Sequence, residues 1–358
     1  MTNQDLRLAD FRPRRSLRVP THEVRRPRYP VVDAHNHLGS AFGGEWASRT
    51  PAELAATLDE AGVEAIVDLD GGQGDGLSAE IDRWQTALPD RVAVFAGLDY
   101  DGWASDPRFG ETEANRLRDS AARGARGLKV WKLLGLRARD PDGRLVAVDD
   151  PRLDPLWTAA AEVRLPVVIH IADPVAFFEP LDGTNERWEE LRDHPDWHFW
   201  PTRSGAEPDA NGFPPFDELL AAFGRLVARH PATTFVGAHV GCAAEDLALV
   251  GRLLDENANL SVDIAARLGE LGRQPYTARA FFLRHADRIL FGVDMAPDPD
   301  IYAIHYRFLE TLDESFDYGT GPIPEQGRWQ IHGIGLPDDV LRKVYADNAR
   351  RILRWERA

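Results

Sequence analysis

The chain has 358 residues, a length that allows one large α/β barrel or two to three smaller domains. With 43% hydrophobic, 28% charged and 9% aromatic residues, it has the composition of a soluble globular protein, which excludes disorder throughout. The single cysteine, Cys242, excludes a disulfide framework and a cysteine-based zinc cage. The net charge of −16 disfavours nucleic acid as a partner, and the absence of a run of about 18 apolar residues excludes a membrane-spanning helix.

The charge is distributed unevenly along the chain. Residues 1–30 contain eight arginines and three acidic residues, so this segment carries +5 and the rest carries −21. The segment lacks the apolar core of a secretory signal, and its acidic residues and prolines argue against a transit peptide. We therefore expect a cytoplasmic protein whose residues 1–30 form a basic arm lying on an acidic body, residues 31–358. A partner-binding tail is the alternative.

Eight short apolar runs rich in β-branched residues alternate with stretches of helical spacing. The predicted strands are Val31–His37, Ala65–Leu69, Val92–Leu98, Gly127–Lys132, Pro166–Ile171, Thr234–His239, Leu260–Ile264 and Ile289–Val293. The predicted helices are Ala52–Ala61, Leu77–Leu88, Ala114–Arg123, Leu153–Val163, Phe216–His230, Ala244–Asn257, Thr277–His285 and Asp338–Arg354. Eight such pairs predict a (β/α)₈ TIM barrel. A doubly wound sheet is disfavoured because His35–Gly39, after the first strand, is no glycine-rich dinucleotide turn.

The segment Asp173–Pro215, after the fifth predicted strand, is too long for a simple connection. Its aromatic residues, among them Trp188, Trp197 and Trp200, argue against disorder. In a barrel this segment leaves from the C-terminal face, where active sites form. We therefore expect it to fold over the barrel mouth as a lid that carries substrate selectivity.

Metal-type ligands stand at the ends of four predicted strands. The first strand carries Asp33, His35 and His37, which strand alternation would place on one face. The fifth ends at His170, the sixth at His239 and the eighth at Asp294. Burying such groups singly is costly, and barrel closure would bring them into one ring. Imidazoles with a carboxylate suit Zn²⁺, Mn²⁺ or Fe²⁺, so the pattern predicts a metal site.

This pattern resembles the amidohydrolase superfamily, over a match from about Val31 to the C-terminus. The segments Phe235–Gly241 and Leu290–Asp294 resemble the amidohydrolase-related branch, which contains hydrolases and non-oxidative decarboxylases such as aminocarboxymuconate-semialdehyde decarboxylase. The resemblance implies His35, His37, His170 and Asp294 as metal ligands. It implies that His239 is a catalytic residue close to a single metal ion, for which Zn²⁺ is the first expectation.

The fourth strand leaves the number of metals open. Some superfamily members carboxylate a lysine at the end of this strand and bridge two metals with it. Lys129 and Lys132 lie on opposite faces, so at most one can point into the barrel. If that lysine is carboxylated, His170 and His239 would both bind a second metal; if it stays charged, it could bind a substrate carboxylate.

Other candidates carry weaker signals. The glycine-rich segment Gly71–Gly76 lacks the residues of a phosphate loop, and Asp263 and Arg267 could orient substrate, form an ion pair or cap a helix. Arg203 and Trp188 of the long loop, together with Lys129 or Lys132 of the fourth strand, are predicted substrate-binding residues. For the polar loop residues Glu179, Asn185, Arg187 and Arg203, however, exposure to solvent is the simpler interpretation. Cys242 is expected to be a small buried hydrophobe.

The predicted function is metal-dependent hydrolysis of a lactone, amide or ester-like carbonyl in a small polar substrate. A divalent cation lowers the pKa of bound water from about 15.7 toward about 7. Asp294 would hold the metal and accept a proton, while His239 would act beside it. The alternative reaction is decarboxylation of a small aromatic or unsaturated acid; a non-catalytic binding barrel is disfavoured by the complete ligand set. The expected partner is a small molecule, with no nucleic acid or membrane, and assembly as a homodimer is left open.

Overall fold

The computed structural model describes residues 6–7, 11, 16–39, 44–200, 212–321, 324 and 326–355, and it contains all eight predicted strands. They are β1 (Val31–Asn36), β2 (Val63–Asp68), β3 (Val92–Val94), β4 (Leu128–Val130), β5 (Val167–Ile169), β6 (Phe235–Gly237), β7 (Leu260–Asp263) and β8 (Ile289–Leu290). Every pairing between neighbours is parallel, within the orders β1-β2-β3 and β4-β5-β6-β7-β8.

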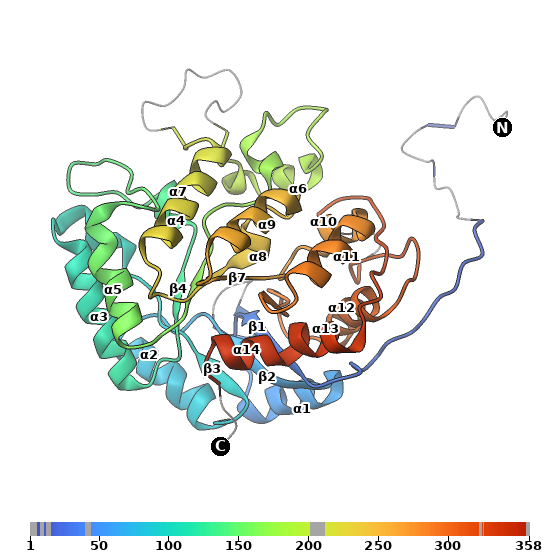
Figure 1. Ribbon diagram of the computed structural model, residues 1–358, viewed down its shortest axis with the longest axis horizontal. Coiled ribbons are helices and arrows are strands. Elements are labelled where there is room, and N and C mark those ends of the chain that lie inside the picture. The colour runs from blue at the N-terminus through green and yellow to red at the C-terminus, as the bar shows by residue number, and fades with distance from the viewer. Residues whose placement is uncertain are drawn as a thin grey trace.

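Two junctions close these strands into a barrel. A parallel bridge between Ala96 and Leu128 joins the end of β3 to β4. The Ala34 amide donates to the Phe291 carbonyl at 2.9 Å, which joins β1 to the segment after β8. Helices surround the strands (Figure 1). The predicted (β/α)₈ barrel is confirmed.

The helices follow the predicted order with some changes in extent. They are α1 (Pro51–Ala61), α2 (Gly74–Glu80), α3 (Phe109–Arg123), α4 (Leu133–Leu136), α5 (Asp154–Glu162), α6 (Trp188–Asp193), α7 (Phe216–Arg229), α8 (Ala238–Gly241), α9 (Leu247–Glu256), α10 (Leu268–Arg273), α11 (Pro275–Arg284), α12 (Pro299–Glu310), α13 (Asp338–Arg342) and α14 (Asn348–Ile352). The predicted helices Leu77–Leu88 and Asp338–Arg354 each contain a π-helical stretch, Ile81–Thr86 and Lys343–Asp347. Helix α12 was not predicted, although its start carries clear signals: Asp298 caps it and Pro299 is its first residue.

Alternation along the strands separates an inner from an outer apolar layer. Val168 of β5 and Val236 of β6 lie in the inner cluster, together with Ile352 of α14. Their neighbours Val167 and Phe235 belong to the larger cluster shared with the helices. Lys129 pairs in register with Val168 and is fully buried, so β4 directs a lysine into the barrel interior. Among the described residues, no helix is both long and apolar enough to cross a membrane.

Residues 22–28 of the N-terminal arm contact acidic residues of the barrel. The His22 amide donates to Asp313 Oδ2 at 2.7 Å, and Arg25 pairs with Asp300. Arg28 pairs with Asp338 at 2.8 Å. In Figure 1 this segment, drawn in blue, runs past α13 toward α1. The arm therefore uses its basic residues to bind the barrel's own acids.

Replacing Asp313 with asparagine is expected to release this arm. Burial alone would raise the pKa of Asp313, but hydrogen bonds from His22 and Arg307 outweigh it and lower that pKa. Ionised Asp313 therefore stabilises the docked arm fully above about pH 4, and this stabilisation is lost as the pH falls through the lowered pKa of Asp313. At neutral pH, trypsin should cleave after Arg25 and Arg28 faster in Asp313→Asn than in wild type. Equal cleavage in Asp313→Asn and in a control, Asp255→Asn, would contradict this docking.

The long loop after β5 is fastened to the rest of the barrel by a buried ion pair. The Arg187 side chain is fully buried; it pairs with Glu270 of α10 and, at 2.8 Å, with Glu190. Phe177, Phe178 and Phe199 are also buried, whereas Trp188 and Trp197 are about 40% and 37% exposed. The expectation of a solvated charge at Arg187 is therefore wrong, because two buried carboxylates compensate the guanidinium.

Removing this guanidinium should destabilise the protein strongly. Arg187→Met would leave Glu190 and Glu270 buried without their cation, which typically costs about 3–5 kcal/mol. Urea unfolding should show this loss in the free energy of unfolding. The matched variant Arg192→Met removes an exposed neighbour that pairs with Asp193, and it should change that energy by less than about 0.5 kcal/mol. Similar effects of the two variants would show that the buried pair does not hold the loop.

Candidate active site

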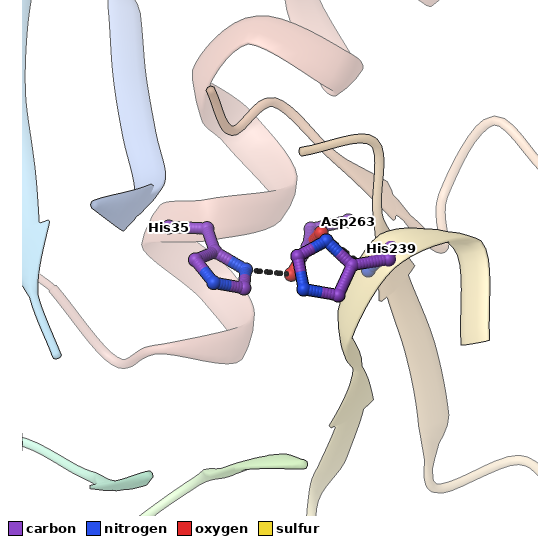
Figure 2. Close-up of side chains that lie close together, drawn as sticks. All are labelled: His35, His239 and Asp263. Atoms are coloured by element: carbon purple, nitrogen blue, oxygen red, sulfur yellow. Dashed lines mark hydrogen bonds and ion pairs between the residues drawn. The ribbon is translucent and has the colours of Figure 1, made fainter. Parts of the chain in front are cut away.

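The end of β1 presents two histidines whose ring orientation is set by carboxylates. His35 Nδ1 lies 2.8 Å from Asp263 Oδ2, and His37 Nδ1 lies 2.6 Å from Asp70 Oδ1. A carboxylate accepts the proton of the nearer nitrogen, so in the neutral form of each ring the lone pair is on Nε2. His35 contacts Asp263 and His239 in Figure 2, inside the barrel. Both rings are therefore held in the tautomer that a metal ligand requires.

Asp33 does not share the face of these histidines, contrary to the alternation rule. Its carboxylate accepts hydrogen bonds from Tyr302 of α12 at 2.7 Å and from Asn36 at 2.8 Å. The pairing of β1 with β2 shifts register between Asp33 and Asn36. A register shift breaks the two-residue period, so Asp33 supports β1 from the helix layer while His35 and His37 enter the site.

Asp294 joins the two histidines. Its Oδ1 atom lies 3.1 Å from His37 Nε2 and 3.4 Å from His35 Nε2. The residue has φ of 56°, a left-handed conformation uncommon for a residue with a side chain, and its amide donates to the His35 carbonyl at 2.9 Å. Gly292 permits this approach, because a Cβ atom there would lie 2.9 Å from His35 Cβ. Backbone strain at Asp294 thus directs its carboxylate toward the β1 histidines.

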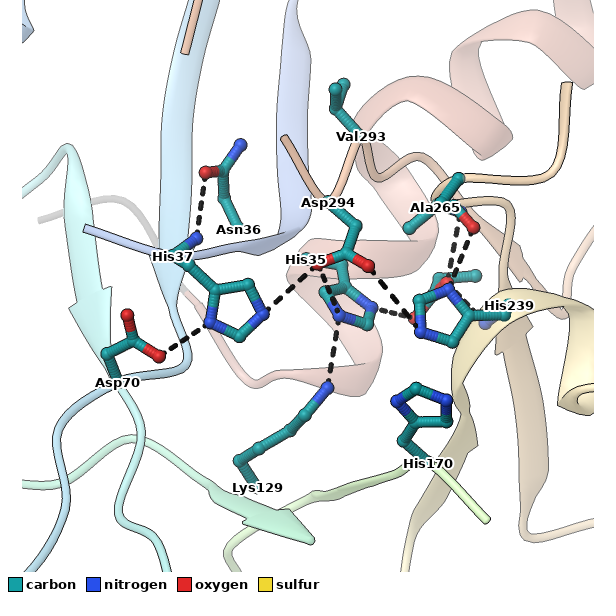
Figure 3. A network of polar contacts seen from close by, with 12 residues as sticks. His35, Asn36, His37, Asp70, Lys129, His170, His239, Ala265, Val293 and Asp294 are labelled. Atoms are coloured by element: carbon teal, nitrogen blue, oxygen red, sulfur yellow. Dashed lines mark hydrogen bonds and ion pairs between the residues drawn. The ribbon is translucent and has the colours of Figure 1, made fainter. Parts of the chain in front are cut away.

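His239 lies on the other side of the same carboxylate. It stands just beyond β6 in a turn with φ of 58°, and its Nε2 lies 3.6 Å from Asp294 Oδ2. Nδ1 lies 2.9 Å from the Ala265 carbonyl, which can only accept, so Nε2 is the unprotonated nitrogen. Figure 3 shows this arrangement of His37, His35 and His239 around Asp294.

His170 borders the site beside His239, and their ring centroids are 4.4 Å apart. Its Nε2 lies 3.0 Å from the Ala172 carbonyl and 3.3 Å from Asp173 Oδ1. Asp173 also pairs with Lys132, whose ammonium lies 5.6 Å from the Trp197 ring. Among the described residues, two groups of three potential metal ligands converge, and both contain His35. One group adds His37 and Asp294, and the other adds His239 and Asp263. His170 lies next to these groups but belongs to neither.

Lys129 enters the same cluster from β4. Its ammonium lies 3.1 Å from His35 Nε2 and 4.9 Å from the centre of the Trp131 ring. Burial lowers the pKa of Lys129, although Asp294 and Asp263 oppose the shift. Of the two lysines on this strand, Lys129 is the inward one, and Lys132 lies outside the cluster in its pair with Asp173.

The titration behaviour of the cluster fits a cation site. Burial lowers the pKa of His37, but the hydrogen bonds and charges of Asp294 and Asp70 outweigh it and raise that pKa to about 9. Burial opposes ionisation of Asp294, yet His35, His37 and Lys129 hold its pKa below the ordinary value. Burial also lowers the pKa of His170 to about 4 and that of His239 well below its ordinary value. At neutral pH a proton therefore occupies His37 Nε2, the atom that a cation would take, and once that proton is released His35, His37 and Asp294 offer two imidazole nitrogens and a carboxylate oxygen, a donor set that suits a divalent cation.

Two predicted substrate-binding residues, Trp188 and Lys132, lie apart from this cluster. Trp188 is partly exposed and packs under the Arg192 guanidinium, 5.2 Å away. Arg203 lies outside the described residues. The sequence analysis did not identify Asp70, which orients His37, or Asp173, which contacts His170. Each follows shortly after a predicted strand, and that position is the signal that identified His170 and Asp294.

Asp70→Asn should weaken metal binding without removing a ligand. An amide oxygen still accepts from His37 Nδ1 but carries no charge, so ring orientation survives and ligand basicity falls. Loss of such an outer partner typically lowers metal affinity by about 10- to 100-fold. Competition with a chelator would measure it, and unchanged affinity would show that Asp70 does not support His37.

Comparison with known proteins places the chain in a family. The profile of the amidohydrolase family matches residues 32–355. The chain belongs to the amidohydrolase family. The predicted family resemblance is thereby confirmed, and the chain is an enzyme of the amidohydrolase superfamily, whose members typically use a divalent metal. None of the curated protein sequences compared with it matches significantly.

Solved structures confirm the TIM-barrel fold at low sequence identity. A 2,6-dihydroxybenzoate decarboxylase in complex with 2,6-dihydroxybenzoate is 16% identical, with a TM-score of 0.56, covering 91% of this chain and 99% of its own. A TIM-barrel protein from Bordetella bronchiseptica is 14% identical, with a TM-score of 0.53 and coverages of 91% and 99%. A 5-carboxyvanillate decarboxylase from Novosphingobium aromaticivorans, solved with manganese, is 13% identical, with a TM-score of 0.51 and coverages of 91% and 97%.

Proposed function

We propose that this member of the amidohydrolase family is a metal-dependent hydrolase of a carbonyl centre in a small polar substrate. The position of Asp294 carries the proposal. One oxygen of its carboxylate faces His35 and His37, and the other faces His239. A single residue can therefore serve a cation on one side and move a proton on the other.

The residues that would hold the cation are His35, His37 and Asp294, with His170 at the border of the site. A bound divalent cation supplies a Lewis acid there, which acidifies water and polarises a carbonyl. The proposed cation is a single Zn²⁺, as expected from the sequence.

Proton transfer falls to Asp294 and His239. Ionised Asp294 accepts a proton from the attacking water at its carboxylate. His239, neutral and unprotonated at Nε2, can take up that proton 3.6 Å from Asp294 Oδ2. Once protonated, it becomes a donor and can pass the proton to the leaving atom. The Ala265 carbonyl keeps the ring oriented through both steps.

Decarboxylation is the second candidate, favoured by Trp131 and Lys129. The Trp131 ring lies 4.9 Å from the His37 ring and the Lys129 ammonium lies over it, so a flat wall and a cation adjoin the ligands. These features suit an aromatic carboxylic acid. Two structural neighbours, as their names state, decarboxylate 2,6-dihydroxybenzoate and 5-carboxyvanillate.

An isotope experiment separates the two reactions. Purified metal-loaded enzyme would be screened against lactones, amides, esters and aromatic acids in H₂¹⁸O and, separately, in D₂O. Hydrolysis adds one ¹⁸O to the product, whereas decarboxylation releases CO₂ and places deuterium on carbon. The inactive variant Asp294→Ala supplies the background. Turnover with deuterium on carbon and no ¹⁸O would overturn the hydrolase proposal and support the decarboxylase.

A further inference from the structure

Lys132 joins the end of β4 to the beginning of the long loop. It follows the last residue of β4 by two positions, and its ammonium pairs with the carboxylate of Asp173, the first residue of that loop. Asp173 is only 6% exposed, whereas the Lys132 side chain keeps 26% of its surface exposed. A carboxylate buried to this extent is costly unless a cation compensates it, and the Lys132 ammonium supplies that charge.

The same ammonium contacts the part of the loop that returns toward the barrel. It lies 5.6 Å from the centre of the Trp197 ring and 5.6 Å from that of the Phe199 ring, within the range of a cation–π interaction. The Phe199 amide donates to the Phe177 carbonyl at 2.8 Å, so the outgoing and returning segments are paired there. Lys132 therefore fastens both segments of residues 173–200 to the end of β4.

Asp173 carries this contact onward to the cation site. Its Oδ1 atom lies 3.3 Å from His170 Nε2, and the Ala172 carbonyl lies 3.0 Å from the same nitrogen. Two acceptors face Nε2, so Nε2 carries the proton and Nδ1 is the unprotonated nitrogen of the neutral ring. Figure 3 shows the His170 ring beside that of His239, and their centroids are 4.4 Å apart. The first residues of the loop thus set the orientation of His170.

We propose that Lys132 is a positioning residue that couples the long loop to the cation site through Asp173 and His170. In this role its ammonium binds a carboxylate of the protein instead of one of the substrate. Release of the loop would free Asp173 and with it the His170 ring, and a cation held beside His170 would in turn order the loop, because such coupling is reciprocal. The inference rests on the proposed function in placing a cation at this cluster, and it is independent of the reaction that follows.

A double-mutant cycle on Zn²⁺ affinity tests the coupling without any substrate. Competition with a chromophoric chelator would be measured for Lys132→Met, Asp173→Asn, the double variant and Lys132→Arg. The control is Lys343→Met, which removes a surface lysine that pairs with Asp287 at 2.9 Å. Asp173→Asn and Lys132→Met should each weaken Zn²⁺ binding by about 10- to 100-fold, as loss of an outer partner typically does. Because Lys132 acts through Asp173, the double variant should lie within about two-fold of Asp173→Asn alone.

Two further results are expected from the same proteins. Lys132→Arg keeps the charge that compensates Asp173, so it should restore most of the Zn²⁺ affinity, and Lys343→Met should leave the affinity unchanged. Hydrogen exchange followed by mass spectrometry should be faster in residues 175–199 of Lys132→Met than of wild type. Added Zn²⁺ should slow this exchange in wild type and slow it less in Lys132→Met, which a purely local structural role would not produce.

Three outcomes would overturn the proposal: Zn²⁺ affinity of Lys132→Met within about two-fold of wild type, additive losses in the double variant, or unchanged exchange of residues 175–199 in Lys132→Met. If Lys132→Met fails to fold, as judged by circular dichroism, Lys132→Gln takes its place, because it keeps a donor for Asp173 and lacks the charge. Products with ¹⁸O but Zn²⁺ affinity unaffected by Lys132 would overturn the coupling and leave hydrolysis intact. Products without ¹⁸O together with the expected affinities would disprove hydrolysis and leave the coupling intact.

Discussion

Asp294→Ala and His37→Ala are each expected to abolish tight metal binding and all turnover. Asp294 Oδ1 lies 3.1 Å from His37 Nε2, so each variant removes one of the groups that converge there. Loss of Asp294 also removes the proton acceptor beside His239. Elemental analysis of the purified variants, with the substrate screen, would measure both effects.

The matched control for Asp294→Ala is Asp255→Ala, which removes a half-exposed aspartate of α9 that pairs with Arg284. That variant should retain the metal and its activity. Full metal occupancy in both Asp294→Ala and His37→Ala would show that the ligands are misassigned.

His239→Gln is expected to keep the metal and lose rate. The glutamine can still donate to the Ala265 carbonyl, but it cannot take up and return a proton near neutral pH. Loss of a general acid–base group typically lowers the rate by roughly 10²- to 10⁴-fold. Metal content, kcat and KM measured together would separate this effect from weaker substrate binding, because the loss should fall on kcat.

A second histidine provides the control for this variant. His230 pairs with Asp154 at 3.0 Å, ahead of β6 and away from the cluster, so His230→Gln should leave kcat unchanged. Loss of the metal in His239→Gln would contradict the one-metal arrangement. It would favour the alternative in which His170 and His239 bind a second metal and Lys129, the inward lysine, is carboxylated.

The order of strands and helices, and the strand ends that carry ligands, could be read from the sequence. A buried parallel strand is an apolar run, and a polar ligand that ends it stands out against that background. His35, His37 and Asp294 were identified in this way, and the structure brings them together. Lys129 and Lys132 were also correctly assigned to different surroundings, because two-residue alternation separates positions three apart.

Only the tertiary structure decided where several of these side chains point. Alternation placed Asp33 with the histidines, but a register shift in β1, which no single-strand pattern reveals, turns it toward Tyr302. The amides of the left-handed residues His239 and Asp294 likewise donate to other strands, to the Asp263 carboxylate of β7 and to the His35 carbonyl of β1.

Long-range pairing accounts for the remaining differences. Arg187 reads as a solvated loop charge, yet it is buried because Glu270, 83 residues away, compensates it. For Arg267 the sequence left substrate orientation, an ion pair or a helix cap open, and among the described residues it is buried with a backbone carbonyl as its hydrogen-bond acceptor. Composition and periodicity determine which segments form strands and helices, because these depend on neighbours along the chain. Whether a charged side chain is buried or exposed depends on which distant residue pairs with it, and that pairing forms only when the barrel closes.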